Sequence, residues 1–135
     1  MKNIAFYLTP KINVVFEYKD ASMRQLFEKM EHHRYTSIPI LNEKGHYEGT
    51  ITEGDILRKI SKKDTISFKD MENLYVKDIK RSKLYSPVSI DADFKDLLNV
   101  IAHQNFVPVV DDQGVFIGIV TRSAILSSFE KLLAE

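Results

Sequence analysis

The sequence predicts an α/β (α+β) fold made of two copies of one unit, each running strand-helix-strand-strand-helix. Three observations carry this prediction: a duplicated apolar-Pro-apolar motif, a helical stripe before each motif and a second helix after it. The second copy of the motif follows the first at a constant offset of 69 residues (39 to 108). The two copies are Ile38-Pro39-Ile40 with Gly45, Gly49 and Thr52, and Val107-Pro108-Val109 with Gly114, Gly118 and Thr121.

Apolar residues spaced i, i+3, i+4 and i+7 predict the first helix of each copy. The two stripes are Met23, Leu26, Phe27 and Met30, and Phe94, Leu97, Leu98 and Ile101. The candidate N-caps are Asp20 or Ser22 for one helix and Asp91 or Asp93 for the other. The offset between the stripes is 71 (23 to 94), so the first copy has two extra residues near 34–37.

A β-hairpin is expected after each of these helices, because two short apolar runs flank a glycine-containing turn. The paired runs are 37–41 with 47–52, and 106–110 with 115–120. A second helix follows each hairpin. Its apolar residues are Ile56, Leu57 and Ile60 in one copy, and Ile125, Leu126, Phe129, Leu132 and Leu133 in the other.

One further strand is expected before each first helix, at 12–16 and 84–90. Pro39 and Pro108 lack an amide donor, so each must lie early in its strand or at a sheet edge. Polar residues follow the first copy. The predicted division is a first repeat with the N-terminal segment at 1–62, a linker at 63–75 and a second repeat at 76–135. Neither repeat can cover its sheet alone, so the two are expected to pack together.

Composition excludes several classes of function. Lysine plus arginine and aspartate plus glutamate both number 19, so the net charge is zero, which gives no support to nucleic-acid binding. The chain has no cysteine and no apolar run long enough for a membrane span. The short apolar stretch at the start is too brief for a signal peptide. We expect a cytoplasmic protein that binds neither nucleic acid nor membrane.

No catalytic arrangement can be assembled from the sequence. It offers no Ser-His-Asp order, no carboxylate dyad and no Walker-type glycine loop. The four histidines, His32, His33, His46 and His103, lack the spacing of a metal site. We therefore expect a binding module, not an enzyme, with no cofactor and no metal.

The duplicated motif, helices and strands resemble the CBS domain, a repeat that occurs as a tandem pair. The resemblance covers residues 12–60 and 84–129. It implies two repeats related by a pseudo-twofold axis, and a homodimer stacked through helices. It also implies two clefts for adenosine-type ligands. Each cleft would combine strand residues of one repeat with a Thr-x-x-Asp helix start of the other.

In the first cleft the resemblance implies a nucleotide site that departs from the family pattern. Ala124 replaces the family's aspartate, so the usual ribose contact is missing, while Arg122 and Lys11 offer cations suited to a phosphodiester. The nucleotide-binding residues implied are Lys11, Asn13, Val14, Tyr35, Thr36, Ser37, Ile38, Pro39, Thr121 and Arg122.

In the second cleft the ribose-binding aspartate of the family is present as Asp55, but Glu53 is expected to repel phosphate. The residues implied are Ser86, Asn105, Phe106 and Val107, with Tyr85, from one repeat and Thr52 and Asp55 from the other.

Two segments also resemble the stand-alone CBS-pair proteins of Gram-positive bacteria that bind cyclic di-AMP. They are residues 34–39 (Arg-Tyr-Thr-Ser-Ile-Pro) and 116–122 (Phe-Ile-Gly-Ile-Val-Thr-Arg). Ser123 stands where that group often has a second arginine, which should weaken phosphate binding or favour a mononucleotide.

Each candidate residue also has an ordinary structural interpretation. Arg122 and Arg34 can be surface arginines, Asp55 a helix cap worth about 1 kcal/mol, and Tyr35 and Phe106 core aromatics. Thr52 and Thr121 can likewise be caps.

The leading hypothesis is an adenine-nucleotide sensor that signals through an unidentified effector protein. Cyclic di-AMP is the first ligand, and AMP, ADP or ATP the second. The terminal helix, with Leu126, Phe129, Leu132 and Leu133, supports a homodimer. The alternative is a ligand-free dimerisation or scaffold module, which Ala124 and Glu53 favour.

Overall fold

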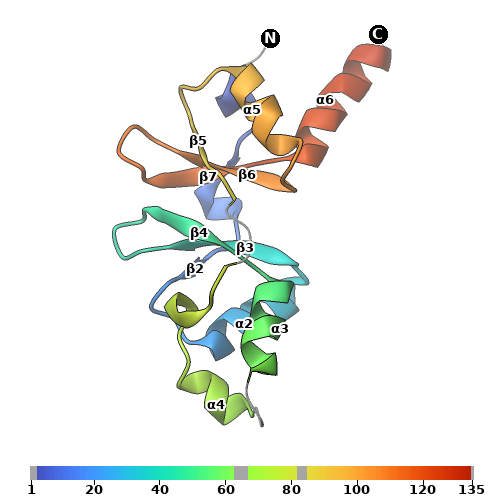
Figure 1. The fold of residues 1–135 in the computed structure, drawn as a ribbon. Helices are drawn as coiled ribbons and strands as arrows, with labels where there is room; N and C mark the ends of the chain where they lie inside the picture. Colours follow the sequence, from blue (N-terminus) through green and yellow to red (C-terminus); the bar gives the residue numbers. More distant parts are fainter. Residues whose placement is uncertain (1–2, 63–66, 82–84, 135) are drawn as a thin grey trace. The chain divides into compact units, whose positions relative to one another are not determined.

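The hairpin of each repeat belongs to a separate sheet in the computed structural model, which describes residues 3–62, 67–81 and 85–134 (Figure 1). The chain divides into two units. Unit 1 joins residues 1–14 to residues 85–135, and unit 2 spans residues 15–84. Among the described residues there are six α-helices and two sheets. The mixed α/β class predicted from the sequence is therefore confirmed.

Unit 2 is a three-stranded sheet in the order β2-β3-β4 with helices α2 and α3 on one face (Figure 1). Its elements are β2 (Glu17–Tyr18), α2 (Met23–His33), β3 (Ser37–Leu41), β4 (Tyr47–Thr52), α3 (Glu53–Ser61), α4 (Phe68–Glu72) and the 3-10 turn η2 (Val76–Asp78). The predicted stripe of α2 supplies Met23, Leu26 and Met30 to a core completed by Ile38, Ile40, Ile51 and Ile56.

Unit 1 is a four-stranded sheet in the order β1-β7-β6-β5, with α1 and α5 on one face (Figure 1). Its elements are α1 (Ile4–Tyr7), β1 (Thr9–Pro10), η1 (Lys11–Asn13), β5 (Val88–Ser89), α5 (Phe94–Ile101), β6 (Phe106–Val110), β7 (Phe116–Thr121) and α6 (Arg122–Ala134). Phe94, Leu97 and Ile101 of α5 pack with Val107, Val109 and Val120.

A glycine in the last strand of each hairpin makes room for a segment from elsewhere in the chain. Thr9 of β1 pairs with Ile119 of β7, and a Cβ on Gly118 (φ +156°) would lie 2.2 Å from the Thr9 carbonyl oxygen. In unit 2, a Cβ on Gly49 (φ +121°) would lie 3.1 Å from Cδ of Arg81. The segment preceding the first repeat thus docks on the second hairpin, and the segment preceding the second repeat docks on the first.

The two prolines occupy equivalent places in the central strands. The Glu53 amide donates to the Thr36 carbonyl, so the backbone groups of every second residue from Thr36 onward face β4. The backbone nitrogen of Pro39 therefore lies on the opposite side of β3, toward β2. The parallel partner β2 begins pairing only at Ile40. Pro108 has the same relation to β5, which pairs from Val109 onward. The missing amide therefore leaves no gap in either ladder.

The strand predicted at 12–16 is wrong. Lys11–Asn13 form a 3-10 turn, and the strand is Glu17–Tyr18. The reason is that the chain passes from unit 1 to unit 2 at residues 14 and 15, so only the residues beyond this crossing can pair with β3. In the second repeat, the strand expected at 84–90 is limited to Val88–Ser89, and residue 84 lies outside the described residues.

Part of the segment expected as a linker is folded onto unit 2. Met71, Val76 and Ile79 are buried in its core, and the Met23 amide donates to the Leu74 carbonyl at 2.7 Å. Residues 63–66 lie outside the described residues. Met71 anchors α4, and Val76 and Ile79 anchor the segment that follows it, so the chain after α3 has a fixed place on unit 2.

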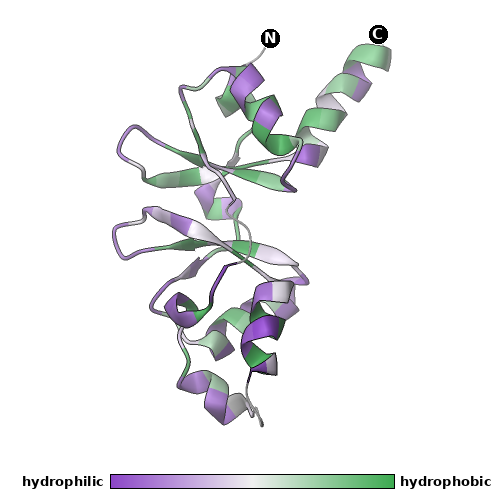
Figure 2. Ribbon diagram, in the orientation of Figure 1, coloured by the Kyte–Doolittle hydropathy of each residue, from purple (hydrophilic) through white to green (hydrophobic). Residues whose placement is uncertain are grey.

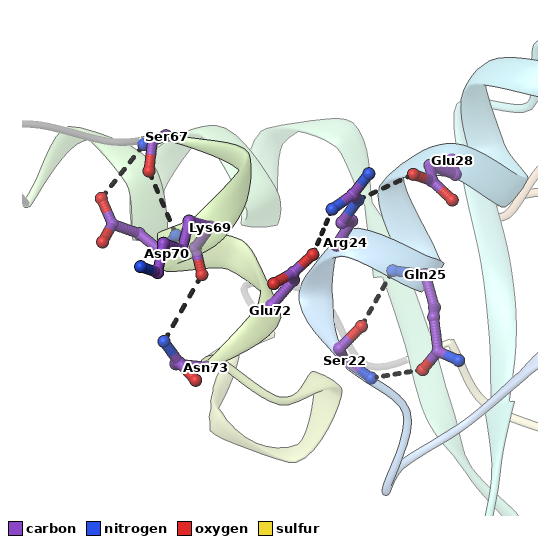
Figure 3. A network of polar contacts seen from close by, with 9 residues as sticks. All are labelled: Ser22, Arg24, Gln25, Glu28, Ser67, Lys69, Asp70, Glu72 and Asn73. Atoms are coloured by element: carbon purple, nitrogen blue, oxygen red, sulfur yellow. Dashed lines mark hydrogen bonds and ion pairs between the residues drawn. The ribbon is translucent and has the colours of Figure 1, made fainter.

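Polar contacts also join α4 to α2 (Figure 3). Arg24 of α2 donates to Glu28 at 2.9 Å and to Glu72 of α4, and these hydrogen bonds raise its pKa. Both helices begin with a capping box, Ser22 with Gln25 and Ser67 with Asp70. Since the Arg24 pairs are exposed, burial rather than ion pairing carries most of the docking energy.

Substitution of Gly118 tests the docking of β1. Gly118→Ala should lower the free energy of unfolding by about 3–5 kcal/mol, because backbone strain adds to a clash with the Thr9 carbonyl. Gly114→Ala is the matched control: its φ is also positive, but a Cβ there meets nothing within 4 Å, so about 1–2 kcal/mol is expected. Urea unfolding measures both. Equal losses would contradict the close approach.

Candidate functional site

The start of helix α3, which belongs to the second predicted cleft, is a closed capping box. Thr52 Oγ1 accepts from the Asp55 amide at 3.2 Å, and Asp55 Oδ2 accepts from the Thr52 amide at 2.9 Å. Asp55 Oδ1 accepts from Arg58 Nη2 at 2.6 Å, and the carboxylate side chain is 0% exposed. The capping role considered for Asp55 and Thr52 is confirmed. Contact between Asp55 and a ribose would require Arg58, whose side chain is 55% exposed, to release Oδ1.

The second helix start, at α6, is capped differently because Ala124 has no carboxylate. Thr121 Oγ1 accepts from the Ala124 amide at 3.1 Å and lies 3.1 Å from Ser123 Oγ. The threonine therefore keeps its capping role on α6, as Thr52 does on α3. The α6 start lacks the buried acidic group that closes the α3 box.

Arg122 reaches back over the end of α5. Its Nε donates to the Ile101 carbonyl at 3.0 Å, Nη2 to the Ala102 carbonyl at 3.2 Å and Nη1 to Asn105 Oδ1 at 3.4 Å. These bonds satisfy carbonyls that the end of α5 leaves without helical partners. Arg122 is exposed, so an anion can reach it, but binding would exchange at least one of these contacts.

Each predicted cleft draws residues from both units. In the first cleft, unit 1 contributes Lys11, Asn13, Val14, Thr121 and Arg122, and unit 2 contributes residues 35–39. In the second cleft, Tyr85, Ser86, Asn105, Phe106 and Val107 belong to unit 1, and Thr52 and Asp55 belong to unit 2.

Lys11 and Arg122 are associated with opposite ends of β7. Thr9 lies opposite Ile119 and Pro10 opposite Gly118, so the chain runs from there toward the start of the strand, away from Thr121. The two side chains are therefore associated with positions about four residues, or about 13 Å, apart along β7. Asn105, which the sequence assigned to the other cleft, is the predicted site residue that contacts Arg122.

The segment 35–39 divides into exposed and buried parts. Tyr35 is 47% exposed and its ring stacks on His33 at a centroid distance of 5.8 Å. Thr36 is exposed and Ser37 is half-buried, whereas Ile38 and Pro39 are buried. The side chains accessible to a ligand on this segment are therefore those of residues 35–37.

A cavity of about 430 Å³ in unit 2 brings Tyr35 and Thr36 together with Glu53. The other lining residues are Glu31, Arg34 and the apolar side chains of Phe27, Met30, Ile56, Leu57 and Ile60. Glu53 thus faces the cavity of Tyr35, and it is absent from the lining of the cavity that contains Asp55. Its charge acts on the Tyr35 side of α3.

Gln104 is a buried residue that the sequence analysis missed. Its Oε1 accepts from the Ser86 amide at 2.7 Å, and its Nε2 donates to the carbonyls of Ser86 (3.2 Å) and Phe106 (3.1 Å). The side-chain amide thereby occupies both backbone groups of Ser86, as the edge of a nucleobase would. The only signal in the sequence is that Gln104 stands 69 residues after Tyr35, so the second copy has an amide where the first copy has an aromatic ring.

Phe106 and Tyr85 lie beside this contact, with ring centroids 5.1 Å apart. Phe106 is 8% exposed and Val107 is fully buried, so both contribute to the core of unit 1. Of the second-cleft residues in unit 1, Ser86 and Asn105 are the exposed ones, and Tyr85 is half-buried.

Two further features concern the part of the chain that the structure describes. In that part of the chain, no three His, Asp or Glu side chains are grouped so that they could hold a metal ion. None of its helices has the length and apolar character that crossing a bilayer requires.

The Gln104 contacts predict a large effect of losing one amide. Gln104→Leu leaves three backbone groups without their partner, one in a buried contact and two in partly buried contacts, and should cost about 2–4 kcal/mol in the free energy of unfolding. Gln113→Leu makes the same chemical change at an exposed turn of the same unit and should stay within about 0.5 kcal/mol. Guanidinium unfolding compares them; a neutral Gln104→Leu would contradict the network.

Comparison with known proteins identifies the repeat. The family model of the CBS domain matches residues 7–62 and 76–131. An uncharacterised protein of Methanopyrus kandleri is 31% identical over 108 residues, which are 78% of this chain and 53% of that protein. The chain thus spans about half the length of this curated relative.

Solved structures match over nearly the whole chain. A CBS domain protein from Streptococcus pneumoniae is 26% identical, with a TM-score of 0.84 over 97% of this chain and 88% of that one. CbpB of Listeria monocytogenes, in complex with c-di-AMP, is 24% identical with a TM-score of 0.82 over 98% of each chain. Another CbpB complex with c-di-AMP is 23% identical, with a TM-score of 0.87 over 98% of this chain and 87% of that one.

Proposed function

The chain belongs to the CBS-domain family, whose members are regulatory modules rather than catalysts, and from this premise we propose that it is an adenine-nucleotide sensor. The tandem fold predicted from the sequence is confirmed by the family model and by the structural likenesses. The observation that carries the proposal is the likeness along nearly the full chain to CbpB proteins solved with c-di-AMP.

The proposed ligand binds between the repeats, with the Arg122 side as the leading site. Arg122 is exposed at the start of a 13-residue helix, where free amides and the positive end of the helix dipole favour an anion. Tyr35 offers an exposed ring for a base, and Thr36 and Ser37 offer hydroxyls. Cyclic di-AMP is the first ligand we propose, and AMP, ADP or ATP the second.

Signalling is proposed to follow from a shift in population. A ligand that contacts both repeats stabilises the arrangement that it bridges, and an effector protein then recognises that arrangement. We propose that the effector is a separate protein. We also propose a cytoplasmic location, because the nucleotides named are cytoplasmic metabolites.

Arg122→Ala tests the site. It should weaken c-di-AMP binding by at least about ten-fold, because a charge-assisted contact to phosphate is lost. Stability should also fall by about 1–3 kcal/mol, because Arg122 no longer bonds to the end of α5. Lys95→Ala, an exposed lysine on α5, is the control and should change neither quantity. Calorimetry and thermal unfolding separate the effects; full affinity in Arg122→Ala would reject the site.

A ligand-free scaffold is the second candidate. It is favoured by Asp55, whose two oxygens are occupied within α3, and by Arg122, whose guanidinium bonds to the end of α5. A thermal-shift panel of c-di-AMP, ATP, ADP and AMP discriminates the two candidates. A ligand at 100 times its Kd adds about 2.7 kcal/mol of stability, whereas a scaffold shows no shift with any of them.

A homodimer is proposed through α6. Leu126, Leu132 and Leu133 are 61%, 62% and 88% exposed, and Figure 2 shows apolar residues along much of this helix. Exposed apolar patches of this kind mark association surfaces. Leu132→Glu should convert a dimer to a monomer in light scattering at micromolar concentration, whereas the neighbouring Lys131→Glu should leave it dimeric. A monomeric parent protein would contradict the proposal.

A further inference from the structure

We infer that the groove between α2 and α3 of unit 2 is a docking site for a basic amphipathic helix of the effector protein. The groove is the cavity of about 430 Å³ that contains Tyr35. On the side of α2 it is lined by Phe27, Met30, Glu31 and Arg34, and on the side of α3 by Glu53, Ile56, Leu57 and Ile60. Each set has the spacing i, i+3, i+4, i+7 of one helix face, so a third helix can pack its side chains between the two.

The middle of the groove and one of its ends are apolar and accessible. Leu57 is 64% exposed, and Phe27 and Ile60 are half-buried. Met30 and Ile56 lie beneath them, each 5% exposed. An apolar side chain that inserts here removes the exposed surface of Leu57 from water, and burial of such surface is favourable.

The other end of the groove carries charge. The Glu53 amide donates to the Thr36 carbonyl at 2.9 Å, so the start of α3 adjoins the end of α2, and Glu31, Arg34 and Glu53 lie toward this end. None of these three side chains forms an ion pair with a described residue. Two carboxylates against one guanidinium leave a negative charge, and the C-terminal end of the α2 dipole adds to it.

The combination of an apolar channel and an acidic end determines which occupant fits. Glu31 and Glu53 disfavour an anion, and an apolar small molecule would leave both carboxylates without a partner. A helix with apolar side chains on one face and lysine or arginine beside them matches both parts of the groove.

A second copy of this chain is the competing occupant, through the exposed apolar residues of α6. In the C-terminal part of that helix, Glu130 and Lys131 cancel in charge, so α6 offers no excess of cations to the acidic end. Charge complementarity therefore favours a helix from a separate, basic partner. The homodimer proposed above uses α6 of unit 1 and does not assign an occupant to this groove.

Tyr35 and Thr36 connect the groove to the proposed nucleotide site. Both residues line the groove, and both are proposed ligand contacts. A nucleotide that holds the exposed Tyr35 ring changes this end of the groove, so nucleotide and helix should alter each other's affinity. This coupling, and the assignment of the helix to the effector, rest on the proposed function. The docking itself depends only on the residues of unit 2.

Fluorescence anisotropy of the full chain with a labelled synthetic peptide tests the groove. The probe has about 14 residues, or about four helical turns, with leucine on one face and lysine on the other. Leu57→Ser should weaken its binding about ten-fold, because the contact of one leucine is lost. Ile12→Ser is the matched control. It removes an apolar side chain that is 91% exposed outside the groove, so it should bind the peptide as the parent does.

A second pair of variants tests the acidic end. Glu31→Gln combined with Glu53→Gln should weaken binding of the lysine peptide about five-fold and reduce its dependence on salt, because the attraction to lysine is lost. Glu43→Gln combined with Glu130→Gln removes two exposed carboxylates outside the groove and should change neither quantity. A control peptide with glutamate in place of every lysine should bind the parent at least ten-fold more weakly, or about that.

The outcomes separate the groove from nucleotide sensing. Binding of the lysine peptide that falls in Leu57→Ser and in the double glutamine variant supports the groove, whether or not c-di-AMP binds the chain. Equal affinity in parent and variants, no binding of the lysine peptide, or equal binding of the glutamate peptide overturns it. Conversion of a dimeric parent to a monomer by Leu57→Ser in light scattering would place a second copy in the groove and also overturn it. Bound c-di-AMP that leaves the peptide affinity unchanged overturns the coupling.

Discussion

The close approach of two backbones at Gly118 is the constraint on which the arrangement of unit 1 depends. The Thr9 carbonyl lies where any side chain at Gly118 would begin, so β1 can complete the sheet only beside a glycine. Gly49 has the same position in the first hairpin and gives space to Arg81. Each hairpin thus accepts a segment that precedes the other repeat, and the unit boundaries at residues 14 and 84 follow from this exchange. A tandem repeat connected in this way cannot be cut between its copies without removing a strand or a core contact from one unit.

The exchange also explains which parts of the fold were predictable. The stripes of α2 and α5 and both hairpins follow from local periodicity, and the structure forms them within one or two residues of the predicted bounds. The strand expected at 12–16 failed because Ile12 and its neighbours alternate like a strand while their place in the chain is a crossing between units. The burial of Met71 and Val76 could not be predicted, because they lie five positions apart in a polar stretch and form no periodic apolar pattern. Local pattern predicts an element; it does not predict what a distant segment covers.

The candidate site was predictable to the same degree. Residue types at the helix starts could be read directly, and Asp55 and Thr52 form the cap that their spacing favours. The partners of Arg122 and Gln104 could not be read, because the carbonyls of Ile101 and Ala102 and the backbone of Ser86 are brought to them by tertiary packing. In both cases a polar side chain satisfies main-chain groups that a helix end or an irregular segment leaves open. The sequence thus shows which side chains can form hydrogen bonds, but their main-chain partners depend on tertiary packing.

The two helix starts therefore differ in how they can respond to an anion. At α3 the acidic cap neutralises Arg58, so an incoming phosphate competes with Asp55 for that guanidinium while the neighbouring lysines remain available. At α6 no carboxylate is present in the equivalent position, and Arg122 is held instead by neutral carbonyls, which bind a guanidinium more weakly than a charged oxygen does. Exchange of a carbonyl for a phosphate oxygen is favourable, whereas exchange of a carboxylate for a phosphate is closer to balanced. The aspartate of one copy is alanine in the other, so the α6 start lacks the carboxylate that holds Arg58 at α3, and its arginine is easier for a phosphate to recruit.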